Sequence, residues 1–222
     1  MMKTKKLSLI GGVSVCVLIV LLTWAYALLS NASASVEKII LPCDVEDSHA
    51  KEAIEWAVEN GFMKIETVDG ASYFFPKSEV KKGEIAKVFV TYFDIDVKKY
   101  EDTEIGFADE SQISEELLPY VRAAVSNGYI KLFSDYTYRA DSLVSREEIA
   151  DIFAPHCKIS VSAGKSEKFS DFDDVSLYFK DNVKKIVDLE IMVGYSDGTF
   201  RPKNIITREE LAMVLYRFAQ LE

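Results

Sequence analysis

The chain has 222 residues, of which 49% are hydrophobic and 28% are charged, and this composition is sufficient to bury a core. Its formal net charge of -10 makes it a poor general binder of nucleic acid or of anionic membrane surfaces. Binding of an anion must therefore depend on a few basic side chains placed close together.

The start of the chain has the pattern of an export signal. Lysines at positions 3, 5 and 6 precede an uncharged apolar run from Leu7 to Leu29, and Ala32-Ser33-Ala34 fits the small-residue pattern of a cleavage site. We expect residues 1–34 to be a signal peptide that is cleaved after Ala34. The alternative is a permanent membrane anchor through residues 7–29, because about 20 apolar residues can span a bilayer. In both cases the rest of the chain is predicted to lie outside the cytoplasmic membrane.

Two cysteines, Cys43 and Cys157, follow this leader. An exported pair of cysteines can form a disulfide. Two isolated cysteines in a chain of this length are more often thiols, and we expect no bond between them.

The rest of the chain contains an internal repeat. Residues 107–153 align with residues 169–215 without a gap. Matching positions include Phe107 with Phe169, Asp109 with Asp171, Thr137 with Thr199 and Arg139 with Arg201. A more divergent copy lies upstream, where Val80, Glu84, Ile85, Ala86 and Phe89 fall on Val144, Glu148, Ile149, Ala150 and Phe153. We therefore predict three units, at residues 42–95, 105–155 and 167–222.

Each unit is predicted to fold as helix, loop and helix. The first helix of the first unit has an apolar stripe, which ends near Gly61 and contains Ala53, Ile54, Ala57 and Val58. Two of the second helices are predicted to begin at capping boxes, formed by Ser145 with Glu148 and by Thr207 with Glu210. A single pair of helices buries too little surface to be stable alone. We expect an all-α fold in which three helix-loop-helix repeats pack as a pseudo-threefold helical bundle.

The third unit carries a long combined pattern, Gly194-Tyr195-Ser196-Asp197-Gly198-Thr199-Phe200 followed by Ile206-Thr207-Arg208-Glu209-Glu210. It resembles the S-layer homology repeat, whose hallmark is a Gly-Tyr-x-Asp-Gly-Thr-Phe loop before an Ile-Thr-Arg-Ala-Glu helix start. Three tandem copies are usual in that family. The resemblance implies an all-α pseudo-trimer that binds secondary polysaccharides of the bacterial cell wall, often with ketal-linked pyruvate, in grooves between repeats.

The resemblance also implies the residues of the site. Arg208 matches the arginine that holds the acidic sugar, Arg146 matches it in the second unit, and Lys82 replaces it in the first. The loop residues Gly194, Asp197 and Gly198 complete the expected ligand-binding set in the third unit. The second unit lacks both glycines, so we expect Arg208 to matter most, Arg146 next and Lys82 least.

Physical chemistry agrees with an anion at this position. A guanidinium can hold a carboxylate with two hydrogen bonds. The first turn of a helix offers backbone N–H groups and a favourable dipole, and we expect these groups to be free to bind the ligand. We also expect replacement of Arg208 by alanine to change stability little, because Thr207 and Glu210 remain to cap the helix. The competing interpretation is that an arginine at a helix start only forms salt bridges within the fold.

The sequence carries no pattern that is typical of an enzyme. The only two histidines, His49 and His156, lie in unrelated contexts without metal-ligand spacing, and no nucleophile elbow or phosphate-binding loop appears. We therefore predict a non-catalytic protein of the cell wall or cell surface, without cofactor, metal or nucleic-acid partner. The alternatives are a membrane-tethered structural protein and an interaction scaffold that has kept the fold without sugar binding. The protein cargo, if the chain anchors one, is not indicated.

Overall fold

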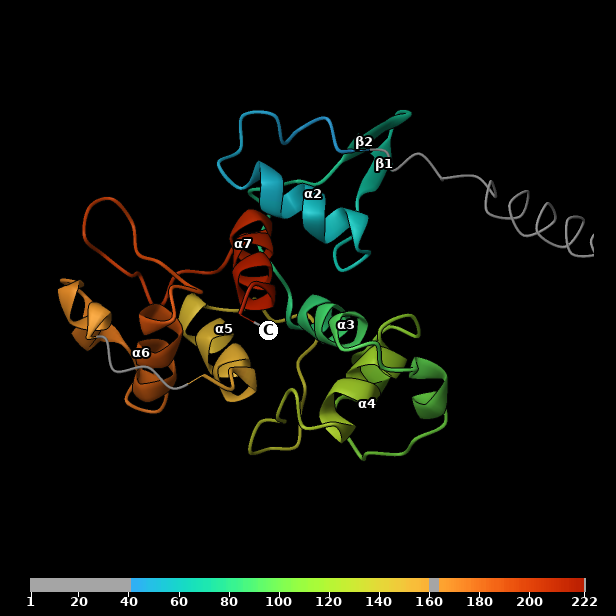
Figure 1. The fold of residues 1–222 in the computed structure, drawn as a ribbon. Helices are drawn as coiled ribbons and strands as arrows, with labels where there is room; N and C mark the ends of the chain where they lie inside the picture. The colour runs from blue at the N-terminus through green and yellow to red at the C-terminus, as the bar shows by residue number, and fades with distance from the viewer. Residues whose placement is uncertain (1–40, 160–163, 222) are drawn as a thin grey trace, which may run out of the picture. The chain divides into compact units, whose positions relative to one another are not determined.

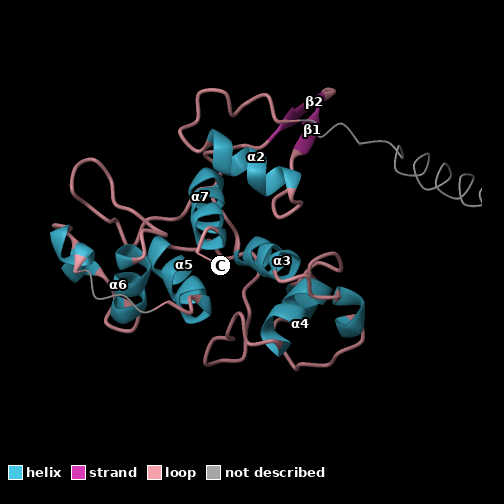
Figure 2. Cartoon of the chain, in the orientation of Figure 1, coloured by secondary structure: helices cyan, strands magenta, loops and turns pink. Residues whose placement is uncertain are grey.

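The computed structural model describes residues 41–159 and 164–221, shown in Figures 1 and 2. The predicted signal peptide or anchor, residues 1–34, lies outside these residues. Within the described ranges, no helix has both the length and the apolar character that crossing a membrane requires.

Helices dominate the described residues. The six α-helices are α2 (Lys51–Glu59), α3 (Lys82–Tyr92), α4 (Leu118–Ser126), α5 (Arg146–Phe153), α6 (Lys180–Asp188) and α7 (Arg208–Ala219). Short 3₁₀ helices connect them: η1 (Val97–Tyr100), η2 (Glu110–Gln112), η3 (Ala154–His156), η4 (Lys165–Lys168) and η5 (Phe172–Asp174). The predicted helix patterns are confirmed where they are most specific. The side chains of Ser145 and Thr207 accept hydrogen bonds from the backbone at the start of α5 and α7, and both capping boxes are complete.

A small hairpin departs from the all-α expectation. Strands β1 (Glu66–Val68) and β2 (Ala71–Tyr73) pair antiparallel between α2 and α3, with Glu66 opposite Tyr73. The turn residues Asp69 and Gly70 both have positive φ, as a tight hairpin turn requires. The hairpin uses the extra length of this loop relative to its counterparts, and Figure 2 shows it in magenta.

The α-helices pack in pairs that cross the boundaries of the predicted units. Helix α3 packs against α4, α5 against α6, and α7 returns to α2 (Figure 1). Buried phenylalanines from the second helices of all three units meet in the core: the ring centroids of Phe89 and Phe153 are 4.7 Å apart, and those of Phe153 and Phe218 are 5.3 Å apart. The packing of each unit is therefore completed by another unit.

A closed ring of backbone hydrogen bonds joins the units just before their second helices. The N–H of Val80 donates to the carbonyl of Ile206 at 3.1 Å, Ile206 donates to Val144 at 2.9 Å, and Val144 donates back to Val80 at 3.2 Å. All three residues are buried. A buried backbone N–H without a partner is costly, so each unit depends on the other two. The ring supports the expected pseudo-threefold bundle, which stays a prediction.

Both cysteines that follow the leader lie among the described residues. Cys43 is exposed and Cys157 is buried, and in the described part of the chain no disulfide joins them.

Deletion of residues 160–222 should leave the remainder largely unfolded, because it removes α6, α7 and the Ile206 corner of the ring. The full chain should unfold in a single transition outside its leader. Circular dichroism during thermal unfolding measures both. A two-unit fragment with a sharp, native-like melting transition would contradict this dependence.

Candidate functional site

Three grooves lie where the second helix of one unit meets the loop of another. Each is named here by its basic residue at the helix start. The Arg146 groove has a volume of about 470 Å³ and is walled by residues 192–196 of the third unit. The Arg208 groove, of about 330 Å³, faces the first unit, and the Lys82 groove, of about 370 Å³, faces the second. The three basic residues predicted from the sequence therefore line three different grooves.

The guanidinium of Arg146 is buried and bonded within the protein. Its Nε donates to the carbonyl of Phe200 at 2.9 Å, and its Nη2 donates to the carbonyl of Val193 at 2.9 Å. Its Nη1 lies 3.3 Å from Oε1 of Glu210. Each of its three nitrogens thus already binds an acceptor from the loop or helix of the third unit.

Arg208 repeats this arrangement against the first unit. Its Nε donates to the carbonyl of Phe74 at 2.9 Å, its Nη2 donates to the carbonyl of Lys64 at 2.7 Å, and its Nη1 pairs with Glu84. The guanidinium carbon also lies 4.6 Å from the centroid of the Phe74 ring. Both arginines therefore clamp the loop of another unit to a helix start, which is the structural role that competed with ligand binding.

The backbone at the helix starts is occupied as well, contrary to the expectation that its N–H groups are free. In α7, the N–H of Arg208 donates to Ser78 and that of Glu209 donates to Pro76, both at 2.9 Å. In α5, Arg146 and Glu147 donate to the carbonyls of Asn204 and Pro202. The capping hydroxyls accept from the next N–H in each helix. These amides close the contacts between units, so they do not form an anion site.

Lys82 differs from the two arginines. Its ammonium lies 3.9 Å from the centroid of the Phe133 ring, a cation–π contact. Among the described residues, no carboxylate forms an ion pair with it, and burial lowers the pKa of Lys82. The sequence ranked this residue last, yet its charged donors are less occupied than those of either arginine.

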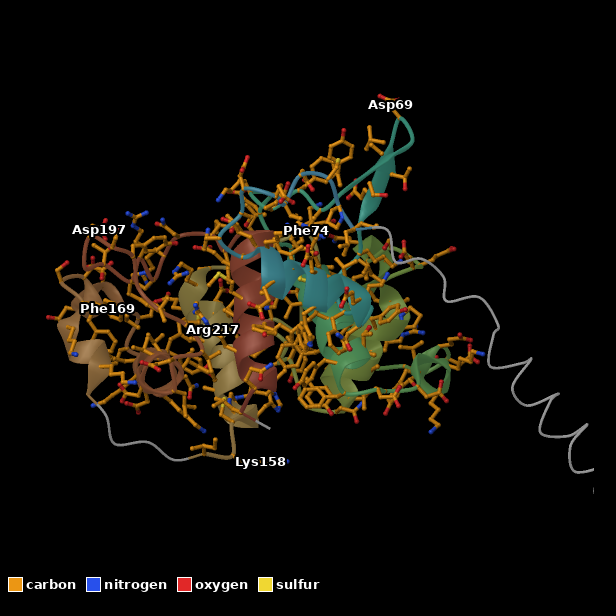
Figure 3. The ribbon with its side chains drawn as sticks, turned by 45° about the horizontal axis from the view of Figure 1, so that its top comes forward. Asp69, Phe74, Lys158, Phe169, Asp197 and Arg217 are labelled. Carbon is orange, nitrogen blue, oxygen red and sulfur yellow. The ribbon has the colours of Figure 1, made fainter. Side chains whose placement is uncertain are left out.

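The loop residues Asp197 and Gly198 shape the loop itself. The carboxylate of Asp197 accepts hydrogen bonds from the backbone and hydroxyl of Thr199 and pairs with Arg201, and these bonds lower the pKa of Asp197 to about 2. Gly198 has φ of +81°, the left-handed region that glycine adopts without strain. Gly194 has another role: a Cβ there would lie 2.1 Å from the Phe169 ring, so only glycine fits. Figure 3 labels Asp197 and Phe169 in this part of the molecule.

An aspartate that precedes each loop forms a further hydrogen-bonding arrangement shared by the three units, which the sequence did not reveal. The carboxylate of Asp171 accepts from the backbone N–H groups of Phe200 and Arg201, both at 2.7 Å. Asp109 and Asp44 bind the loops of the second and first units in the same way. The second residue bound in each loop has positive φ although it is not glycine: Phe75, Arg139 and Arg201. The first unit thus keeps this aspartate arrangement although it lacks the loop motif.

Two further residues of the Arg146 groove were not assigned to the site from the sequence. The hydroxyl of Tyr195 donates to Glu210, and burial together with this bond raises the pKa of Tyr195 to about 12. Arg217, near the end of α7, also lines the groove and is labelled in Figure 3. No sequence motif marks Arg217. Within the described ranges, no group of His, Cys, Asp and Glu side chains is arranged to hold a metal ion.

Comparison with known proteins agrees with the sequence resemblance. Residues 106–150 and 168–212 match the model of the S-layer homology domain. Two segments of the chain thus match this family model, whereas the copy predicted at residues 42–95 is not matched.

Two curated proteins of Acetivibrio thermocellus are similar to the chain. Cell surface glycoprotein 1 is 25% identical over an alignment of 170 residues, which covers 65% of this chain and 6% of that protein. A cellulosome-anchoring protein is 33% identical over an alignment of 95 residues, which covers 41% of this chain and 21% of that protein. The chain therefore spans only a small part of either relative.

Because Arg146 forms these bonds within the protein, we expect its replacement by alanine to lower stability. From the sequence alone, only a small change in stability was expected for the matching residue, Arg208. Arg146→Ala would leave two carbonyls and Glu210 without their partner, and we expect it to lower the free energy of unfolding by about 3 kcal/mol. Arg208→Ala should act in the same direction. Arg139→Ala is the control, since its guanidinium is half exposed and pairs only within its own loop. Urea unfolding measures the difference. Equal stability of Arg146→Ala and the parent would contradict the clamp.

Proposed function

We propose that the chain is a non-catalytic module that attaches to the bacterial cell envelope by holding an acidic wall polysaccharide. The observation that carries the proposal is the match of two segments to the S-layer homology domain. The names of the two relatives, a cell surface glycoprotein and an anchoring protein, point to the same location. We propose ketal-linked pyruvate as the acidic group, because its carboxylate suits the cations in the grooves.

The proposed module comprises three units, including the divergent one at residues 42–95. The ring of backbone hydrogen bonds and the shared aspartate arrangement support including the first unit in the same module as the other two. The grooves lie between units, so the polysaccharide would be held only by the assembled set. On this proposal the chain is exported, and residues 7–29 form the membrane tether if the leader is not cleaved.

A scaffold that keeps the fold without binding sugar is the second candidate. The observation that favours it is the bonding of Arg146 and Arg208 within the protein. The two candidates differ in one respect that can be measured, which is whether the folded chain binds purified wall polysaccharide. The Lys82 groove is the informative place to alter, because its cation is not held by a carboxylate of the described residues.

The full chain should sediment with cell walls purified from the source bacterium, and less with walls from which mild acid has removed ketal-linked acids. Added salt should weaken the binding, since charge pairs open to solvent are screened. Lys82→Gln should weaken it by about ten-fold, the loss of one charge-assisted hydrogen bond. Lys98→Gln, an exposed lysine that lines none of the three grooves, is the control. A folded parent chain that does not bind untreated walls would establish the scaffold instead.

A further inference from the structure

The Arg146 groove holds a cation that the contacts between units do not use. Three basic side chains line it: His49, Arg146 and Arg217. Among the described residues that line it, Glu210 is the only acidic one. Because Arg146 is bound to Glu210 and to two carbonyls, it contributes to the fold and not to an open site.

The negative charge of Glu210 is compensated within the protein. One carboxylate oxygen receives Arg146 and the hydroxyl of Tyr195, and the other receives the N–H of Thr207 at 3.0 Å. Glu210 therefore needs no further cation. The charge that remains uncompensated at the groove wall is that of Arg217.

Arg217 is half-buried, and among the described residues it has no hydrogen bond and no ion pair. The carboxylate of Glu190 attracts it from a distance but is already bound to Lys165 at 2.7 Å. Desolvating a guanidinium without supplying an acceptor is unfavourable. An anion in the groove would remove that cost, and the planar fork of Arg217 can hold a carboxylate with two bonds.

The fold itself does not require an arginine at this place. The corresponding positions, counted from the other two helix starts, are Thr91 in α3 and Pro155 after α5. A cation near the end of α7 gains from the helix dipole, but an exposed side chain would gain as well. The dipole therefore does not account for the partial burial of Arg217 in a groove.

We propose that Arg217 is the residue of the Arg146 groove that binds the acidic substituent of a saccharide, with Arg146 holding the groove wall in place. The ligand class is a carboxylate-bearing sugar. The proposal rests on the proposed function, because it names the group that recognises the ligand in one of the grooves. It assigns ligand recognition to a position outside the repeat motif.

The test is calorimetric titration of the full chain with purified wall polysaccharide, untreated and after mild acid removal of its ketal-linked acids. Arg217→Gln should weaken binding of the untreated polymer by ten-fold or more, the loss of a charge-assisted pair, and should reduce the difference between the two polymers. Arg217→Lys should bind with intermediate affinity, since it keeps the charge without the fork. Lys98→Gln removes one positive charge from an exposed side chain that lines none of the grooves and should bind like the parent.

Thermal melting separates recognition from folding. Arg217→Gln should melt no lower than the parent, because it removes a half-buried charge that has no partner among the described residues. If Arg217→Gln binds the untreated polymer like the parent, or lowers the affinity for both polymers equally, Arg217 does not recognise the acidic group, although the proposed function stands. If the parent itself does not bind the untreated polymer, the proposed function fails and this inference fails with it.

Discussion

The ring of backbone hydrogen bonds among Val80, Val144 and Ile206 is the constraint on which the rest of the structure depends. It lies in the core, directly before the three second helices, so it fixes where each helix starts. The first N–H groups of each helix then donate to carbonyls of another unit. Because these bonds cross between units, the grooves exist only when the ring is closed. The proposed binding would therefore depend on the folding of all three units.

That constraint changes the meaning of the repeat motif. An arginine at a helix start looks like an anion site, but here Arg146 and Arg208 each hold a carboxylate and two loop carbonyls of another unit. Two groove cations that form no ion pair with the described residues deviate from the motif: Lys82, which rests on Phe133, and Arg217. The three grooves are therefore unlike one another. We infer that residues of the repeat motif build the grooves, and that residues that deviate from the motif determine what each groove can bind.

Much of the local structure could be predicted from the sequence, because its causes are local. The capping boxes at Ser145 and Thr207 and the apolar stripe of α2 need only residues within one helix. The partners of Arg208 could not be predicted, since Phe74 and Glu84 lie far away in the chain and in the most divergent unit. The hairpin was missed because the apolar periodicity of the unit predicts helices, and the loop that forms the hairpin is only a few residues longer than its counterparts. Arg217 was missed because its relevance comes from burial, not from a motif.

Native-state hydrogen exchange at the amides of Val80, Val144 and Ile206 tests the closed ring most directly. If the three bonds form one cooperative structure, all three amides should exchange only through global unfolding, with the same opening free energy as the unfolding of the chain. Exposed amides of the β1–β2 hairpin should exchange faster, as an internal reference. Exchange of one ring amide at a clearly lower free energy than the other two would show that the ring opens unit by unit and would contradict the account.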